Sequence, residues 1–66
     1  FQGVEIEDDV ILAPGAKVLG RDGVLRVARG TVVGANAVLL DSTAEGEVWA
    51  GVPARCVGLR EDWPAG

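Results

Sequence analysis

A six-residue period runs through most of the chain. Counted in steps of six, apolar residues recur at Ile6, Leu12 and Val18, and after a three-residue slip they resume at Val27, Val33 and Leu39. A second small or apolar residue follows four positions later at Val10, Ala16, Thr31 and Ala37, and at Leu25 once the three-residue slip is counted. This period matches neither the 3.6 residues of a helix nor the alternation of an ordinary strand. It predicts a parallel β-helix with one short strand and one tight turn per hexapeptide.

The period divides the chain into three parts. Residues 4–40 hold the hexapeptide units, enough for about two coils, and residues 41–66 hold a polar loop, an extended segment (48–58) and a tail. Residues 1–3 are interpreted as the remnant of a purification tag because Phe1 is out of phase with the inward positions; a native cap on the first coil is the alternative. The Gly and Pro spacing leaves no window for an α-helix, so an all-β fold is expected.

Turn residues punctuate the units. Asp8-Asp9 and Pro14-Gly15 suit tight turns, and Asn36 suits a left-handed corner conformation. Residues 21–23 (Arg-Asp-Gly) are expected to form a small loop that causes the slip. The acids at positions 5, 7, 8 and 9 are expected to form a solvated face.

Composition bounds the partners. With ten acidic and six basic residues, the net charge is −4, which argues against nucleic acids and anionic membrane surfaces. A 66-residue chain with few large apolar side chains buries little surface, so we expect it to depend on neighbouring subunits or on a longer polypeptide. The single cysteine excludes an internal disulfide and favours a reducing compartment, the cytoplasm.

The hexapeptide rhythm, followed by a polar loop and then AGVPAR (50–55), closely resembles the C-terminal end of hexapeptide-repeat acyltransferases of the serine acetyltransferase type. The segments IEDDVILAPGAKVLG (6–20) and VVGANAVLL (32–40) resemble that family's last coils. The resemblance covers about residues 4–58. It implies a left-handed β-helix, a homotrimer and an acetyl-CoA cleft between subunits.

The resemblance also implies cofactor contacts. Backbone groups at turns with small residues would lie against acetyl-CoA, and the matching positions are Ala13, Gly15, Gly34 and Ala35. Arg55 would contact the phosphates or the adenine end. The competing interpretation is that tight corners simply need small residues, and that Arg55 is a solvated surface residue.

Two departures from the family pattern concern chemistry. Asp41 stands where relatives often carry a basic residue that helps to hold the phosphates. The family's general base is a histidine, and this chain has none, so no catalytic residue is assigned. No metal site is expected either. Cys56 is expected to be a buried small apolar residue, and Trp49 to point outward into a subunit interface.

Two functions therefore stay open. The chain is either the cofactor-binding end of a CoA-dependent acyltransferase, whose base and acceptor pocket lie upstream in the parent polypeptide, or a non-catalytic β-helical trimerisation module appended to a larger enzyme. The lack of histidine and the presence of Asp41 favour the second for the chain alone, and the AGVPAR ending favours the first for its parent.

Overall fold

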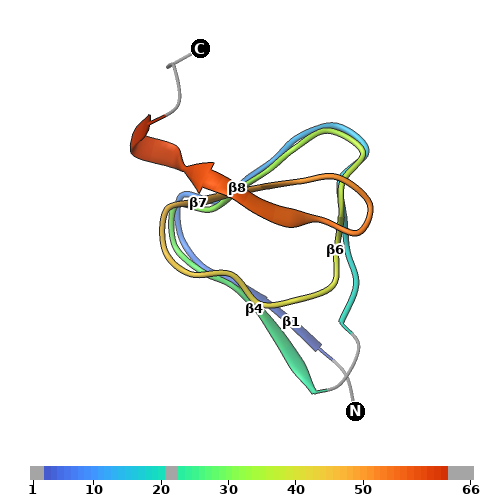
Figure 1. The fold of residues 1–66 in the computed structure, drawn as a ribbon. Coiled ribbons are helices and arrows are strands. Elements are labelled where there is room, and N and C mark those ends of the chain that lie inside the picture. The colour runs from blue at the N-terminus through green and yellow to red at the C-terminus, as the bar shows by residue number, and fades with distance from the viewer. Residues whose placement is uncertain (1–2, 21–22, 63–66) are drawn as a thin grey trace.

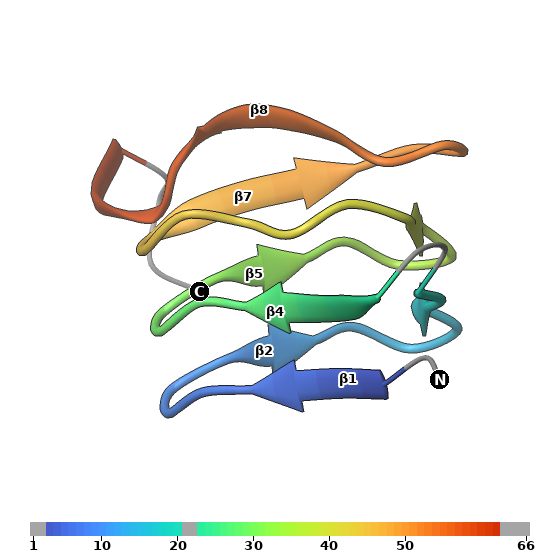
Figure 2. The same ribbon diagram turned by 90° about the horizontal axis from the view of Figure 1, so that it is seen from below.

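The fold is all-β. A computed structural model describes residues 3–20 and 23–62, in which no α-helix is present. Its elements are β1 (Gly3–Ile6), β2 (Ile11–Leu12), β3 (Lys17–Val18), β4 (Val24–Val27), β5 (Val32–Val33), β6 (Val38–Leu39), β7 (Glu47–Ala50), β8 (Arg55–Leu59) and the short 3₁₀ helix η1 (Arg60–Asp62). Figure 1 shows successive passes of the chain following one another around a roughly triangular outline, and Figure 2 shows the same passes as stacked layers.

The layers are joined by parallel strand pairs. β1 pairs with β4, β2 with β5 and β3 with β6, and each pair has the same offset of 21 positions, as from Val4 to Leu25. Three hexapeptides would give an offset of 18, so the additional three positions are the predicted slip. Arg21 and Asp22 of the predicted loop lie outside the described residues, while Gly23 has the positive φ of 74° that a turn glycine tolerates.

The predicted inward positions form the core of the second layer. Residues of both six-residue series are buried there, and Val27, Val33, Ala37 and Leu39 have no exposed surface. Thr31 is also fully buried, and its hydroxyl is satisfied by the Thr43 hydroxyl at 2.8 Å and the Ala44 carbonyl at 3.3 Å. Hydrogen bonding of this kind removes the cost of burying a polar group.

The first layer has the same register but a different exposure. Ile6 is 50% exposed and Leu12 is 42% exposed, contrary to the expectation that both are buried. Their partners in the second layer, Val27 and Val33, are fully buried, so the two rows face the same side of the stack. The reason for the exposure is that β1, β2 and β3 are end strands, and no layer formed by residues 3–20 and 23–62 lies beyond them.

The corners follow the turn residues. Asp9 (φ 62°) and Asn36 (φ 59°) adopt the left-handed conformation, which confirms the expectation for Asn36. The backbone N–H of Asn36 donates to the Pro14 carbonyl at 3.1 Å, so one corner turn lies directly on the next. The acids at 5, 7, 8 and 9 are exposed as predicted, and Glu5 pairs with Arg26 at 3.1 Å.

The polar loop closes the third layer with side chains. The Ser42 and Thr43 hydroxyls accept hydrogen bonds from the backbone N–H groups of Arg26 and Ala28, both at 2.9 Å. The Thr43 N–H donates to the Arg26 carbonyl at 3.0 Å. These groups take the place of a further strand beside β4, so its backbone is satisfied although its sheet ends there.

Trp49 faces the core, so the prediction that it points outward is wrong. It pairs with Val33 and packs against the buried core, and its offset from Val33 is 16 positions instead of 21. The shorter path through the loop shifts the phase. Val48 is also buried, but it pairs with Val32 and does not belong to the core cluster.

β8 ends the stack in the opposite direction. It pairs antiparallel with β7, which makes the sheet β2-β5-β7-β8 mixed. Cys56 lies on β8 and is exposed, so the expected burial is wrong: β8 is an end strand, and no layer within the described part of the chain covers it. Gly3, which had been set aside with Phe1 and Gln2, is the first residue of β1; Phe1 and Gln2, and the tail from Trp63 onward, lie outside the described residues.

Glu47 fixes the loop to the core. One carboxylate oxygen accepts hydrogen bonds from the Ala44 backbone N–H at 2.8 Å and from the Trp49 indole N–H at 2.9 Å. These two donors, the backbone one first, lower the pKa of Glu47 from the ordinary 4.5.

Two leucines in equivalent rows test the layer model. Leu39→Ala removes a fully buried side chain and is expected to lower the free energy of unfolding by about 2–5 kcal/mol. Leu12→Ala, on the open layer, is expected to cost less than about 2 kcal/mol. Urea unfolding followed by circular dichroism measures both, and equal losses would contradict the open end described above.

The Glu47 contacts predict a pH dependence. Because its pKa is lower in the folded state, Glu47 stabilises the fold above about pH 4.5, and this contribution is lost as the pH falls through the folded-state pKa. Glu47→Gln is expected to reduce the free energy of unfolding by about 1 kcal/mol at neutral pH, with the difference from wild type shrinking in acid. Urea titrations at neutral and acidic pH measure it. Exposed Glu45→Gln is the control, and a Glu47→Gln deficit that persisted in acid would refute the assignment.

Candidate functional site

The five predicted cofactor-contact residues lie around one corner of the stack. Three turns meet there, formed by residues 13–16, 34–37 and 51–54 (Figure 1). The Ala13 N–H donates to the Val33 carbonyl at 2.9 Å, and the Gly34 N–H donates to the Trp49 carbonyl at 2.8 Å, so Ala13, Gly34 and Ala50 form one row. Arg55 continues this row because it pairs with Ala50 in β8. Ala35, which is exposed, occupies the tip of the middle turn.

The two glycines have structural reasons to be small. Gly15 has a φ of +80°, and a Cβ placed there would collide with the Asn36 side-chain oxygen, Oδ1. A Cβ on Gly34 would lie 3.4 Å from the Ala50 Cβ and 3.5 Å from the Trp49 carbonyl oxygen. The stacking of the turns therefore accounts for both glycines without a ligand. It also brings the backbone of three layers close to the surface at this corner. A site that binds its ligand through backbone groups requires this.

The positive charges at this corner are exposed. Arg55 is the first residue of β8, and Lys17 is the first residue of β3, directly after the turn 13–16. Within the described ranges, neither side chain has a hydrogen bond or an ion pair. Their charges are therefore available to an anionic ligand.

Groups for acid–base or nucleophilic catalysis are scarce. The chain has no histidine, and the Ser42 hydroxyl is held by the Arg26 N–H. Cys56 is exposed, and its thiol donates to the Gly58 carbonyl at 3.6 Å. The group beside it is the Glu47 carboxylate, whose pKa is lowered mainly by a backbone hydrogen bond and further by the Cys56 side chain, and the chain has no histidine to activate the thiol. Among residues 3–20 and 23–62, no three potential ligand side chains gather as a metal site would require. What this corner can do chemically is bind.

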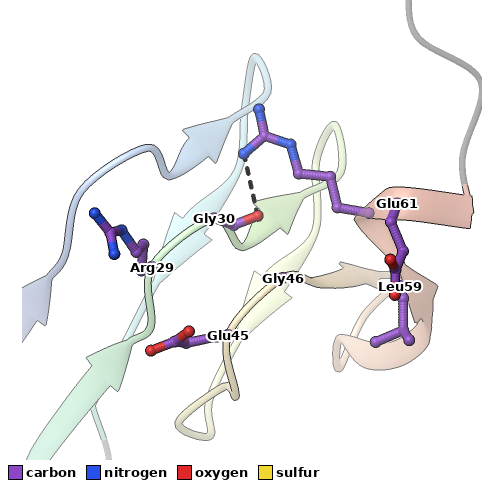
Figure 3. A pocket seen from close by; sticks show the side chains of 7 residues that line it. Arg29, Gly30, Glu45, Gly46, Leu59 and Glu61 are labelled. Atoms are coloured by element: carbon purple, nitrogen blue, oxygen red, sulfur yellow. Dashed lines mark hydrogen bonds between the residues drawn. The ribbon is translucent and has the colours of Figure 1, made fainter.

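An open pocket of about 500 Å³ lies at a different corner and contains none of the predicted site residues (Figure 3). Its lining residues are Arg29, Gly30, Glu45, Gly46, Leu59, Arg60 and Glu61. The Arg60 guanidinium donates through Nη1 to the Asp9 carbonyl at 2.8 Å and the Gly30 carbonyl at 3.2 Å, and its backbone N–H donates to the Gly46 carbonyl at 2.6 Å. Arg60 thus fastens three layers together, which gives this corner a structural explanation.

Sequence reasoning missed several of these residues. Arg60 stood in a tail without period, and the carbonyls that it binds belong to turns whose proximity depends on the stacking. Ser42 and Thr43 were treated as loop residues, although two adjacent hydroxyls after the last repeat are a usable signal for backbone capping. The role of Glu47 could not be predicted from the sequence, because the groups that donate to its carboxylate, a turn N–H and an indole N–H, are brought to it only by the fold.

None of the helices in the described ranges has the length and apolar character needed to span a membrane.

Comparison with known proteins finds similarity to a serine acetyltransferase of Bacillus licheniformis. The two are 42% identical over 52 residues, which make up 79% of this chain and 23% of that protein. The chain therefore spans less than a quarter of the length of the curated relative that it matches. No family model matches the chain, and no solved structure matches it. The similarity indicates an acetyltransferase-related protein.

Proposed function

We propose that this chain is the C-terminal part of a CoA-dependent hexapeptide-repeat acyltransferase and that it supplies the acetyl-CoA side of the site. The observation that carries the proposal is the corner where Ala13, Gly34, Ala50 and Arg55 form one row. A cofactor lying along the stack would meet small residues, close backbone and a cation there. The similarity to a serine acetyltransferase supports acetyl transfer to a hydroxyl or an amine.

The winding proposed for the stack is that of a left-handed parallel β-helix. The regular offset of 21 positions between layers and the burial of the inward rows in the second layer support a parallel β-helix, and its left hand follows from the resemblance to hexapeptide-repeat acyltransferases. The antiparallel β8 then serves as a terminal cap of the helix.

The open first layer is the proposed junction with the upstream part of the parent polypeptide. Val4, Ile6 and Leu12 are all more than 40% exposed, although their partners in the next layer are buried. A preceding coil with the same period would cover these side chains and pair with the end strands β1, β2 and β3. We place the catalytic base and the acceptor pocket in that upstream part.

A second proposal of a different class is a non-catalytic trimerisation module. Asp41, at the position where a phosphate-holding cation is expected, and the lack of histidine favour it for the chain alone. For self-association, the outer row of β2 and β5 offers Ile11, 47% exposed, beside the partly exposed Val32.

The single cysteine supports a cytoplasmic location for the protein. Cell fractionation that recovered the protein from an oxidising compartment would contradict this location.

Calorimetric titration with acetyl-CoA separates the two functions. If the acyltransferase proposal is right, the chain binds acetyl-CoA measurably. Arg55→Glu is then expected to weaken this binding about tenfold or more, because a carboxylate would replace a guanidinium that donates hydrogen bonds to the phosphates. Arg29→Glu, at a different corner, is the matched control and should bind as wild type does. No heat at millimolar ligand would leave the module as the function of this chain, and unchanged binding by Arg55→Glu would remove Arg55 from the site.

Sedimentation equilibrium tests self-association. A trimer is expected at micromolar concentration, and replacement of Ile11 by Asp is expected to shift it toward monomer because a charge would enter the apolar contact. A wild type that sediments as a stable, folded monomer would contradict both the trimer and the expectation that this small core needs partners.

A further inference from the structure

The segments that meet at the candidate cofactor corner contain no acidic residue. They are 10–20, 32–40 and 48–58, and although the chain has ten acids, none of them falls in these segments. The only charges that the segments carry are Lys17 and Arg55, and the Glu47 carboxylate reaches the Trp49 indole from just outside them. In a chain of net charge −4, these segments therefore add no repulsion of their own against an anion.

Lys17 and Arg55 are brought together through Val38. Lys17 pairs with Val38 from the layer below. From the layer above, the Ala54 N–H donates to the Val38 carbonyl at 2.8 Å, and the Gly51 carbonyl accepts from the Val38 N–H at 3.0 Å. Neighbouring strands lie about 4.8 Å apart, so the Lys17 and Ala54 backbones are separated by about 10 Å. Arg55 follows Ala54 directly.

Both side chains project away from the core. Val18, next to Lys17, packs against the core, and Ala54, next to Arg55, is only 2% exposed. Alternation along β3 therefore directs Lys17 outward beside Val38, in the sheet β3-β6, whereas Arg55 begins β8 in the adjoining sheet β2-β5-β7-β8. Both residues are exposed. Two long, flexible cations thus lie on the two sides of the corner that the turns form, near the partly exposed Val38.

We propose that Lys17 and Arg55 act as a pair that binds the phosphate groups of one ligand lying over Val38. The pair rests on the proposed cofactor site and adds to it a second cation from the first layer, three strand positions below Arg55. The planar guanidinium can bind a phosphate through two N–H groups, and the ammonium acts as a compact second charge. A ligand with adjacent phosphates, such as a diphosphate, uses both, whereas a single phosphate gains less from the second cation.

The test compares CoA with inorganic pyrophosphate, using the whole chain. Lys17→Ala is expected to weaken CoA binding about tenfold in calorimetry and to flatten its salt dependence, while Lys17→Arg keeps most of the affinity. Arg29→Ala removes a cation at another corner and should bind as wild type does. Circular dichroism checks that each variant is folded. In an NMR titration with pyrophosphate, the backbone amides of Lys17, Val38 and Arg55 are expected to shift together.

The outcomes separate this pair from the proposed function. If wild type binds CoA and folded Lys17→Ala binds it equally well, the pair is wrong while the cofactor site stands. If wild type binds no CoA but pyrophosphate shifts the three amides, the acyltransferase proposal fails and the phosphate pair stands. If neither ligand acts on these residues, both are overturned.

Discussion

The fixed register between layers is the constraint on which the rest of the structure depends. Each short strand contributes only two to five residues, too few to be stable alone. The backbone hydrogen bonds between these strands also fix the register, and this register aligns Val27, Val33 and Leu39 on the buried side of the stack. A slip by one position would turn these side chains outward. The corner turns cannot slip either, because Asn36 is seated on Gly15 of the layer below.

The six-residue period predicts burial correctly in the second layer. The rows through Leu25, Thr31 and Ala37 were predicted because burial in this fold recurs with the same spacing as the side chains. The assignment of Trp49 failed because residues 41–46 follow a shorter path than a full coil, and its length depends on hydroxyl groups that substitute for a strand. The predicted burial of Cys56 was wrong for a related reason. Apolar neighbours in the sequence do not show whether another layer covers the last strand.

The candidate site was predictable in part. Its small turn residues stand out in the sequence, but their smallness has two causes, stacking and ligand approach, which composition alone does not separate. The contribution of Lys17 required the fold, since it meets Arg55 only through the bonds between Val38 and the last turn. Charge distribution adds information of another kind, because the segments 10–20, 32–40 and 48–58 contain no acid of their own. A binding role for the corner thus depends on both backbone geometry and electrostatics.

The contact between Arg60 and the first turn of the described chain can form only late in synthesis. The residue whose carbonyl Arg60 binds, Asp9, lies 51 positions earlier, in that first turn. During synthesis that turn emerges long before Arg60. The second layer can already hold it through the Gly30 N–H on the Asp8 carbonyl and the Arg29 N–H on the Glu7 carboxylate, and the tie from Arg60 is added later. Contacts of such long sequence separation are entropically costly and slow to form. A chain terminated before Arg60 would contain every strand and still lack the tie that joins its first layer to its last.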